Sequence, residues 1–162
     1  MFEFVWVILI LMVLYAISYT YLAKMNETVE RSDFVRTLNR VQAQLTLNVA
    51  EWYASGKQVS RKEIESKNPL ELIELKPDNY QGELRSNELS KCGLSRWCYL
   101  LDTKRLVYRV KHSAELNNSN AQKNFLVYKL ELSLIEGTRN RGLPTALTLV
   151  PEHKFTWQNV GF

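Results

Sequence analysis

The hydrophobic pattern of the chain begins with an uncharged, mostly apolar run from Phe4 to Ala23, bounded by Glu3 and Lys24. At about 1.5 Å of rise per residue, a helix over this run spans the ~30 Å hydrocarbon core of a bilayer. The alternative is a helix enclosed in a protein core, but a domain of this size seldom encloses a helix that is apolar on every side. The run therefore predicts a transmembrane segment at residues 4–23.

The start of the chain predicts that this segment is retained in the mature protein. A secretory signal has a basic start, a shorter apolar stretch and small residues at a cleavage site. Residues 1–3 contain no Lys or Arg, and no A-x-A sequence follows the run. We therefore expect a short N-terminal tail, residues 1–3, followed by a single-pass anchor.

A helical pattern continues beyond the apolar run, because residues 24–54 contain neither proline nor glycine. The polar residues, Glu27 and Glu30 among them, are assigned to one face, and Gly56 supplies the stop. Anchor and amphipathic segment (24–55) are then one helix of about 52 residues, about 78 Å long. Apolar residues recur in steps of three and four along one stripe: Phe34, Leu38, Val41, Leu45, Val49 and Trp52.

This apolar stripe has to be buried, either by a sheet of the same chain or by a partner helix in a coiled coil. A coiled coil needs sustained heptads with charged flanking positions, whereas this stripe is short and includes Trp52. We therefore expect the second half of the helix to pack on a sheet.

Residues 56–162 predict one globular domain with a four-stranded antiparallel sheet, so that the fold class is α+β. Period-two alternation, with every second residue apolar, is typical of a strand that buries one face. The aromatic residues of these strands, Trp97, Tyr99, Tyr108 and Tyr128, are assigned to the sheet core rather than to a ligand platform. The predicted strands are 97–101 and 106–110, joined as a hairpin, then 125–135 and 146–150, with 155–157 extending or closing the sheet.

The connections of this domain have the composition of turns and loops. Ser60 begins a capping box and predicts a short helix that ends before Asn68 and Pro69. Residues 76–95 and 113–124 are predicted as loops, the second of them mobile, and residues 136–144 as a turn.

Composition and charge exclude several function classes. The 162 residues carry a net charge of +4, and the basic residues are scattered among acidic ones. Nucleic-acid binding needs a basic patch or stripe, so we expect no nucleic-acid partner. The histidines, His112 and His153, are predicted to be exposed at strand ends, with no acid or cysteine at ligand spacing. Because catalytic and phosphate-binding motifs are also missing, we expect no catalytic residues, no metal site, no cofactor and no enzymatic activity.

The cysteines, Cys92 and Cys98, are spaced i, i+6, which fits neither a C-x-x-C redox motif nor a complete zinc site. Two interpretations remain: two reduced, half-buried thiols, or a disulfide that closes a small loop around Gly93. We favour the disulfide, which would place the domain in an oxidising compartment.

A long helix whose first half is membrane-embedded and whose second half packs on an antiparallel sheet resembles type IV pilins and pseudopilins. Four segments resemble the run of pseudopilin-like proteins: Asn68-Pro69-Leu70-Glu71-Leu72, Pro77-Asp78-Asn79-Tyr80-Gln81-Gly82-Glu83-Leu84, Trp97-Cys98-Tyr99-Leu100-Leu101-Asp102 and Leu106-Val107-Tyr108-Arg109-Val110. On these segments the chain is more narrowly similar to accessory proteins of the mannose-sensitive haemagglutinin (MSHA) pilus system of marine Gram-negative bacteria.

The chain departs from that family at its start. Prepilins carry a short basic leader that ends in glycine, and a glutamate inside the apolar run that is thought to pair with a neighbouring subunit. Here no glycine precedes Phe2, and the nearby acid, Glu3, lies outside the run. A carboxylate in lipid without a partner is costly, so its absence removes a device for polymerisation. We expect a pilin-like fold that is not processed and polymerised as a major pilin.

Two topology signals conflict. Lys24, Arg31, Arg36 and Arg40 follow the anchor and nothing basic precedes it, which favours a cytoplasmic domain by the positive-inside rule. The cysteine pair and the pilin-like layout favour the opposite side, and we expect a periplasmic domain.

The resemblance implies a non-enzymatic inner-membrane accessory protein, minor-pilin-like, of type IV (MSHA-type) pilus biogenesis. Its expected partners are pilin or pilus assembly proteins and the lipid bilayer. The alternative is a bitopic assembly-platform scaffold of a pilus or type II secretion machine. The stripe discriminates between them: the chain's own sheet covers it in a pilin-like fold, whereas a scaffold leaves it exposed for a partner.

Overall fold

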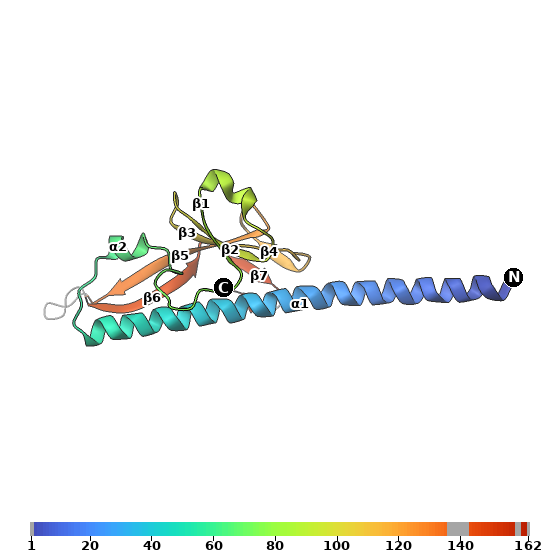
Figure 1. Ribbon diagram of the computed structural model, residues 1–162, viewed down its shortest axis with the longest axis horizontal. Helices are drawn as coiled ribbons and strands as arrows, with labels where there is room; N and C mark the ends of the chain where they lie inside the picture. The colour runs from blue at the N-terminus through green and yellow to red at the C-terminus, as the bar shows by residue number, and fades with distance from the viewer. Residues whose placement is uncertain (1, 136–142, 158–159, 162) are drawn as a thin grey trace.

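The computed structural model describes residues 2–135, 143–157 and 160–161. Its longest element is α1 (Phe2–Ala54), a continuous helix of 53 residues. The N-terminal half of α1 projects away from the rest of the chain, and the C-terminal half lies along the strands (Figure 1). The predicted α+β class with one long N-terminal helix is confirmed. The helix begins at Phe2, inside the predicted tail of residues 1–3.

Helix α1 ends at Ala54, two residues before Gly56. Gly56 has φ +66°, a left-handed conformation that side chains with a Cβ rarely adopt. The N–H of Lys57 then donates to the carbonyl oxygen of Trp52 at 2.9 Å, which closes the last turn. This is the stop that the sequence predicted.

After α1, the described residues contain one short α-helix, one 3₁₀ helix and eight strands. Helix α2 (Arg61–Glu65) begins directly after Ser60, as predicted, although the Ser60 side chain makes no capping hydrogen bond. The remaining elements are β1 (Tyr80–Leu84), the 3₁₀ helix η1 (Ser86–Lys91), β2 (Arg96–Leu100), β3 (Arg105–Arg109), β4 (Leu116–Asn118), β5 (Phe125–Leu134), β6 (Pro144–Pro151), β7 (Phe155–Trp157) and β8 (Val160–Gly161).

The main sheet has five strands in the order β1-β2-β3-β5-β6. The predicted hairpin is present: β2 and β3 are antiparallel, with Trp97 opposite Tyr108. Strands β5 and β6 form the longest ladder, in which Leu130 lies opposite Leu149. In β5 the alternate residues from Leu126 to Leu132 are buried, as their period of two predicted.

The predicted four-stranded antiparallel sheet is wrong in two respects. Strand β1 lies inside the predicted loop 76–95, and it pairs with β2 in parallel, so the sheet is mixed. The parallel pair is made by the crossover through η1. Strand β1 is a half-exposed edge strand that contains Gly82 at φ +120° next to a register shift. Such a strand lacks the alternation that identifies strands in a sequence.

A second sheet of three short strands has the order β4-β7-β8. Strand β4 lies within residues 113–124, which were predicted as a mobile loop, and Asn117 pairs with Thr156 of β7. Strand β7 was predicted to extend or close the main sheet and belongs to this one instead. The predicted turn at 136–144 lies largely outside the described residues.

The core lies between α1 and the strands. Leu45 is 0% exposed, and Phe34 stacks on Trp97 with ring centroids 5.4 Å apart. The predicted stripe is therefore covered by the chain's own strands from Phe34 to Val49, whereas Trp52 is only half-buried.

The same helix also covers the free edge of β6. The Gln42 side-chain amide donates to the carbonyl oxygen of Leu147 at 2.8 Å, and its oxygen accepts the N–H of Leu149 at 2.9 Å. These two bonds replace those that another strand would make, so Gln42 closes an edge that could otherwise pair with a second chain.

Candidate functional site

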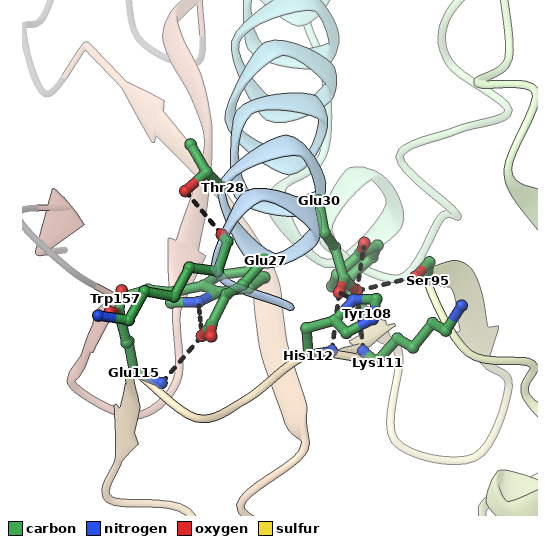
Figure 2. A network of polar contacts seen from close by, with 10 residues as sticks. Glu27, Thr28, Glu30, Ser95, Tyr108, Lys111, His112, Glu115 and Trp157 are labelled. Carbon is green, nitrogen blue, oxygen red and sulfur yellow. Dashed lines mark hydrogen bonds and ion pairs between the residues drawn. The ribbon is translucent and has the colours of Figure 1, made fainter. Parts of the chain in front are cut away.

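Two buried carboxylates on α1 mark the point where the helix leaves the domain. Glu27 is 5% exposed. Glu30, one turn before the buried Phe34, is 7% exposed. A buried carboxylate is costly unless hydrogen bonds compensate its charge. We call these two glutamates and the groups that they contact the helix–domain junction; Figure 2 shows how they lie.

Glu30 has five contacts, which involve both of its oxygens. Its Oε1 accepts the Ser95 hydroxyl at 2.8 Å, the Tyr108 hydroxyl at 3.2 Å and the Lys111 N–H at 2.8 Å. Its Oε2 accepts the His112 N–H at 2.8 Å and lies 2.9 Å from His112 Nδ1. Because an ionised carboxylate can only accept, this last contact requires a proton on Nδ1.

These contacts decide the ionisation of the site. Burial by itself raises the pKa of the Glu30 carboxyl, but the hydrogen bonds from Lys111, His112 and Ser95 outweigh it and hold the pKa below its ordinary value. Burial raises the pKa of the Tyr108 hydroxyl, and the charge of Glu30 raises it further. The junction therefore holds an ionised carboxylate beside a neutral phenol.

Glu27 joins α1 to two other segments. Its Oε1 accepts the Glu115 N–H at 2.9 Å and the indole Nε1–H of Trp157 at 2.9 Å. Glu115 precedes β4 and Trp157 ends β7, so this carboxylate ties the small sheet to the helix. Charge-assisted hydrogen bonds of this kind are about twice as strong as neutral ones. Together the two glutamates hold the helix in one orientation relative to both sheets.

The junction corrects two predictions. Glu27 and Glu30 were assigned to the polar face of the helix, but both are buried under the domain. His112 was predicted to be exposed at a strand end; it is half-buried against Glu30, whereas His153 is exposed as predicted. The spacing along the helix could have predicted the burial of the two glutamates. Positions 27, 30 and 34 continue the apolar stripe in steps of three and four, so these carboxylates lie on the buried face.

Cys92 and Cys98 form a disulfide in the structure, and both residues are fully buried. The bond joins the residue after η1 to the middle of β2. The Arg109 guanidinium donates to the carbonyl oxygens of Cys92 at 2.6 Å and of Ser90 at 3.0 Å, which holds the same crossover against β3.

The aromatic residues of the sheet are core residues, as predicted. Trp97, Tyr108 and Tyr128 are buried, and each has its ring within 6.3 Å of the Phe34 ring, centroid to centroid. The Tyr99 hydroxyl donates to the Ser66 carbonyl at 3.0 Å, and burial raises its pKa to about 12. Within the described ranges, no cluster of three His, Cys, Asp or Glu residues could hold a metal ion.

The N-terminal half of α1 makes a second candidate surface. Its apolar side chains are exposed on every side of the helix, for example Leu9, Leu11 and Leu14. Over the described residues, α1 is the one helix that is long and apolar enough to cross a membrane.

Comparison of the chain with models of protein families, with curated proteins and with solved structures finds no match. Function has to be inferred from the geometry of this chain.

Proposed function

We propose that this protein is a non-enzymatic, single-pass accessory protein of type IV pilus biogenesis, minor-pilin-like and of the MSHA type. Residues 4–23 anchor it in the bacterial inner membrane, and the sheet domain lies in the periplasm. The observation that carries the proposal is the division of α1: one half exposes apolar side chains all round, and the other half buries its stripe under the strands of the same chain.

The exposed half supports an anchor that meets other helices in the bilayer. An apolar helix surface of this length is unstable in water and suits the hydrocarbon core. Pilin and pilus assembly proteins of the inner membrane are the proposed neighbours of this half, because its exposed apolar side chains would lie laterally beside other helices in the bilayer.

The covered half favours the pilin-like hypothesis over the assembly-platform scaffold. A scaffold that forms a coiled coil needs an exposed stripe, but Leu38, Val41 and Leu45 are buried against the strands. A coiled coil through this stripe would require the domain to separate from the helix, against the bonds of Glu27, Glu30 and Gln42.

The disulfide supports the periplasmic side. Disulfides persist in oxidising compartments such as the bacterial periplasm and are rare in the cytosol. Lys24 and the arginines that follow favour the cytoplasmic side by the positive-inside rule. We give more weight to the disulfide, because Cys92 and Cys98 are fully buried and their bond holds the crossover from β1 to β2.

Photo-crosslinking in living cells tests this function. A photoreactive amino acid at Leu14, exposed on the apolar half, is expected to form adducts with a pilin or a pilus assembly protein. The matched control is the same amino acid at Leu45, which is buried in the domain and should give no intermolecular adduct. Deletion of the gene should reduce the number of surface pili. Adducts at Leu45 but not at Leu14 would instead support the scaffold, and normal piliation without adducts would refute the pilus role.

A further inference from the structure

A pocket of about 690 Å³ opens beside the helix–domain junction, next to Glu30. One wall is a single face of α1, formed by Asn26, Val29, Glu30 and Asp33. The opposite wall comes from three short segments that precede or follow the strands: 78–79, 94–96 and 111–112.

The position of this pocket relative to the membrane follows from its place on α1. This step rests on the proposed function, in which residues 4–23 span the bilayer. Glu30 lies about 10 Å along the helix axis from Ala23, the end of the apolar run. Helical side chains tilt toward the N-terminus, which brings the carboxylate back toward the bilayer. The headgroup layer extends about 5–7 Å beyond the hydrocarbon core on each side. The helix wall of the pocket begins at Asn26, about 5 Å from Ala23, so the membrane-proximal end of the pocket reaches this layer, and the pocket extends outward to Asp33, about 15 Å from Ala23.

Two apolar side chains at the pocket agree with this depth. Val29 is 53% exposed and Leu94 is 50% exposed, and they lie on opposite walls. In water both side chains would leave apolar area uncovered, whereas the glycerol and upper acyl region of a lipid would cover it.

The charges on the walls have both signs. Lys111 and Arg96 are exposed cations, and Asp33 and Asp78 are exposed acids. The contacts of the Arg96 and Asp33 side chains are weak: Arg96 Nη1 lies 3.4 Å from the Asp78 carbonyl oxygen, and Asp33 lies 4.0 Å from Arg36. Glu30 is already saturated by five hydrogen-bonding contacts, so its charge is compensated. The remaining charges fit a ligand that is itself a zwitterion.

We propose that this pocket binds the headgroup of an ethanolamine phospholipid from the surrounding bilayer, with the phosphate against Lys111 and Arg96 and the ammonium against Asp33 and Asp78. A primary ammonium has three N–H donors for these carboxylates, whereas the trimethylammonium of a choline headgroup has none. An anionic glycerol headgroup would leave the two acids without a cation. The pocket thus selects a lipid class and fixes the domain on the membrane surface.

Native mass spectrometry of the full-length chain in mild detergent tests this inference. Ethanolamine, choline and glycerol phospholipids with identical acyl chains are added in equal amounts, and the retained lipid is measured. The ethanolamine lipid is expected to be retained in preference to the other two. Lys111→Ala and Asp33→Asn should each lower its retention about five-fold, which corresponds to about 1 kcal/mol per charge near a membrane surface.

Matched controls are Lys62→Ala on α2 and Glu74→Gln, both exposed and outside the pocket, which should leave retention unchanged. Equal retention of the three lipids, preference for the glycerol lipid, or retention that is unchanged by Lys111→Ala and Asp33→Asn would each overturn the inference. A further arm adds free phosphoethanolamine. It should displace the lipid only in part at millimolar concentration, because the acyl region adds contacts with Val29 and Leu94; complete displacement would show that the headgroup alone accounts for binding and would overturn the assignment to a bilayer lipid.

The test of the lipid site and the test of the pilus role can fail independently of one another. Selective lipid retention without crosslinks at Leu14 would leave the lipid site standing and refute the pilus role. Crosslinks at Leu14 without lipid selectivity would do the reverse.

Discussion

His112 contacts one oxygen of Glu30 twice: its backbone N–H donates to Oε2 at 2.8 Å, and its ring Nδ1 lies 2.9 Å from the same atom. This residue comes shortly after β3, so the contact joins the end of a central strand to α1. The contact lies close to the point on α1 where the exposed N-terminal half meets the half that packs on the strands. The orientation of the domain relative to the N-terminal half of α1 therefore depends on a buried carboxylate.

Replacement of this carboxylate is expected to destabilise the domain. In Glu30→Gln the amide offers one acceptor oxygen in place of two, so the part-buried N–H of either Lys111 or His112 loses its acceptor. We expect a loss of about 2–3 kcal/mol in the free energy of unfolding. Urea unfolding of the full chain in mild detergent, followed by tryptophan fluorescence, measures it. Glu51→Gln, exposed on the same helix, should stay within about 0.5 kcal/mol; equal losses would contradict the role of the junction.

The stability of the domain should also fall in acid. Glu30 has a folded-state pKa below its ordinary value, which is about 4.3 in an unfolded chain. Its stabilising contribution is therefore fully present above about pH 4.3 and is lost as the pH falls through the lower folded-state value. Unfolding curves between pH 7 and pH 3 should show this loss, and Glu30→Gln should reduce it. A variant with the same acid dependence as the native chain would exclude Glu30 as the group responsible.

A charge in the apolar half of α1 should prevent stable insertion. Leu11→Arg places a guanidinium in the middle of the run, which costs roughly 2.5–3.5 kcal/mol on insertion scales. Extraction of membranes with carbonate measures the fraction that remains inserted. Leu47→Arg is the matched control, because Leu47 is 68% exposed on the second half of the same helix. A Leu11→Arg variant that resists extraction as well as the control does would rule out a spanning segment.

The two faces of the second half of α1 should respond differently to truncation. Leu45→Ala leaves a cavity in the core and is expected to cost about 2–5 kcal/mol. Leu47→Ala, two residues further on the exposed face, should change stability by no more than about 0.5 kcal/mol. Trp52→Ala should cost less than Leu45→Ala, since Trp52 is only half-buried. Thermal or urea unfolding of the three variants decides this, and similar losses at 45 and 47 would be inconsistent with the packing of α1 on the strands.

The cysteines report on the compartment. If the domain is periplasmic, Cys92 and Cys98 should resist thiol labelling, even after the cells are denatured, until a reductant is added. Denaturation is needed because both residues are buried, so that burial alone would protect free thiols. Because the loop is short, replacing both by serine should cost less than the ~3 kcal/mol that the chain-entropy model assigns to a fifteen-residue loop. A reporter fused after Phe162 gives an independent measure of topology. Thiols that react without reductant, together with a cytoplasmic reporter signal, would refute the periplasmic domain and the pilus role with it.

Elements with local patterns could be predicted from the order of residues along the chain. The length of α1 follows from the absence of proline and glycine before Gly56, and its buried stripe follows from the spacing of Leu38, Val41 and Leu45. The alternation of buried and exposed residues in β5 and the β2–β3 hairpin could also be predicted. In a strand with one buried face, apolar residues recur at every second position whatever the strand pairs with.

Pairings and contacts between residues far apart in the chain became visible in the folded structure. The parallel pairing of β1 with β2 depends on a crossover. The pairing of β4 with β7 joins a segment predicted as a loop to one that was expected to belong to the main sheet. Glutamates such as Glu27 and Glu30 usually lie on the exposed face of a helix. Their burial is favourable here because backbone N–H groups near β3 and β4 and the Trp157 indole donate hydrogen bonds to them. Burial of a charge depends on donors supplied by distant segments, so helical spacing can mark these positions but cannot reveal which groups compensate them.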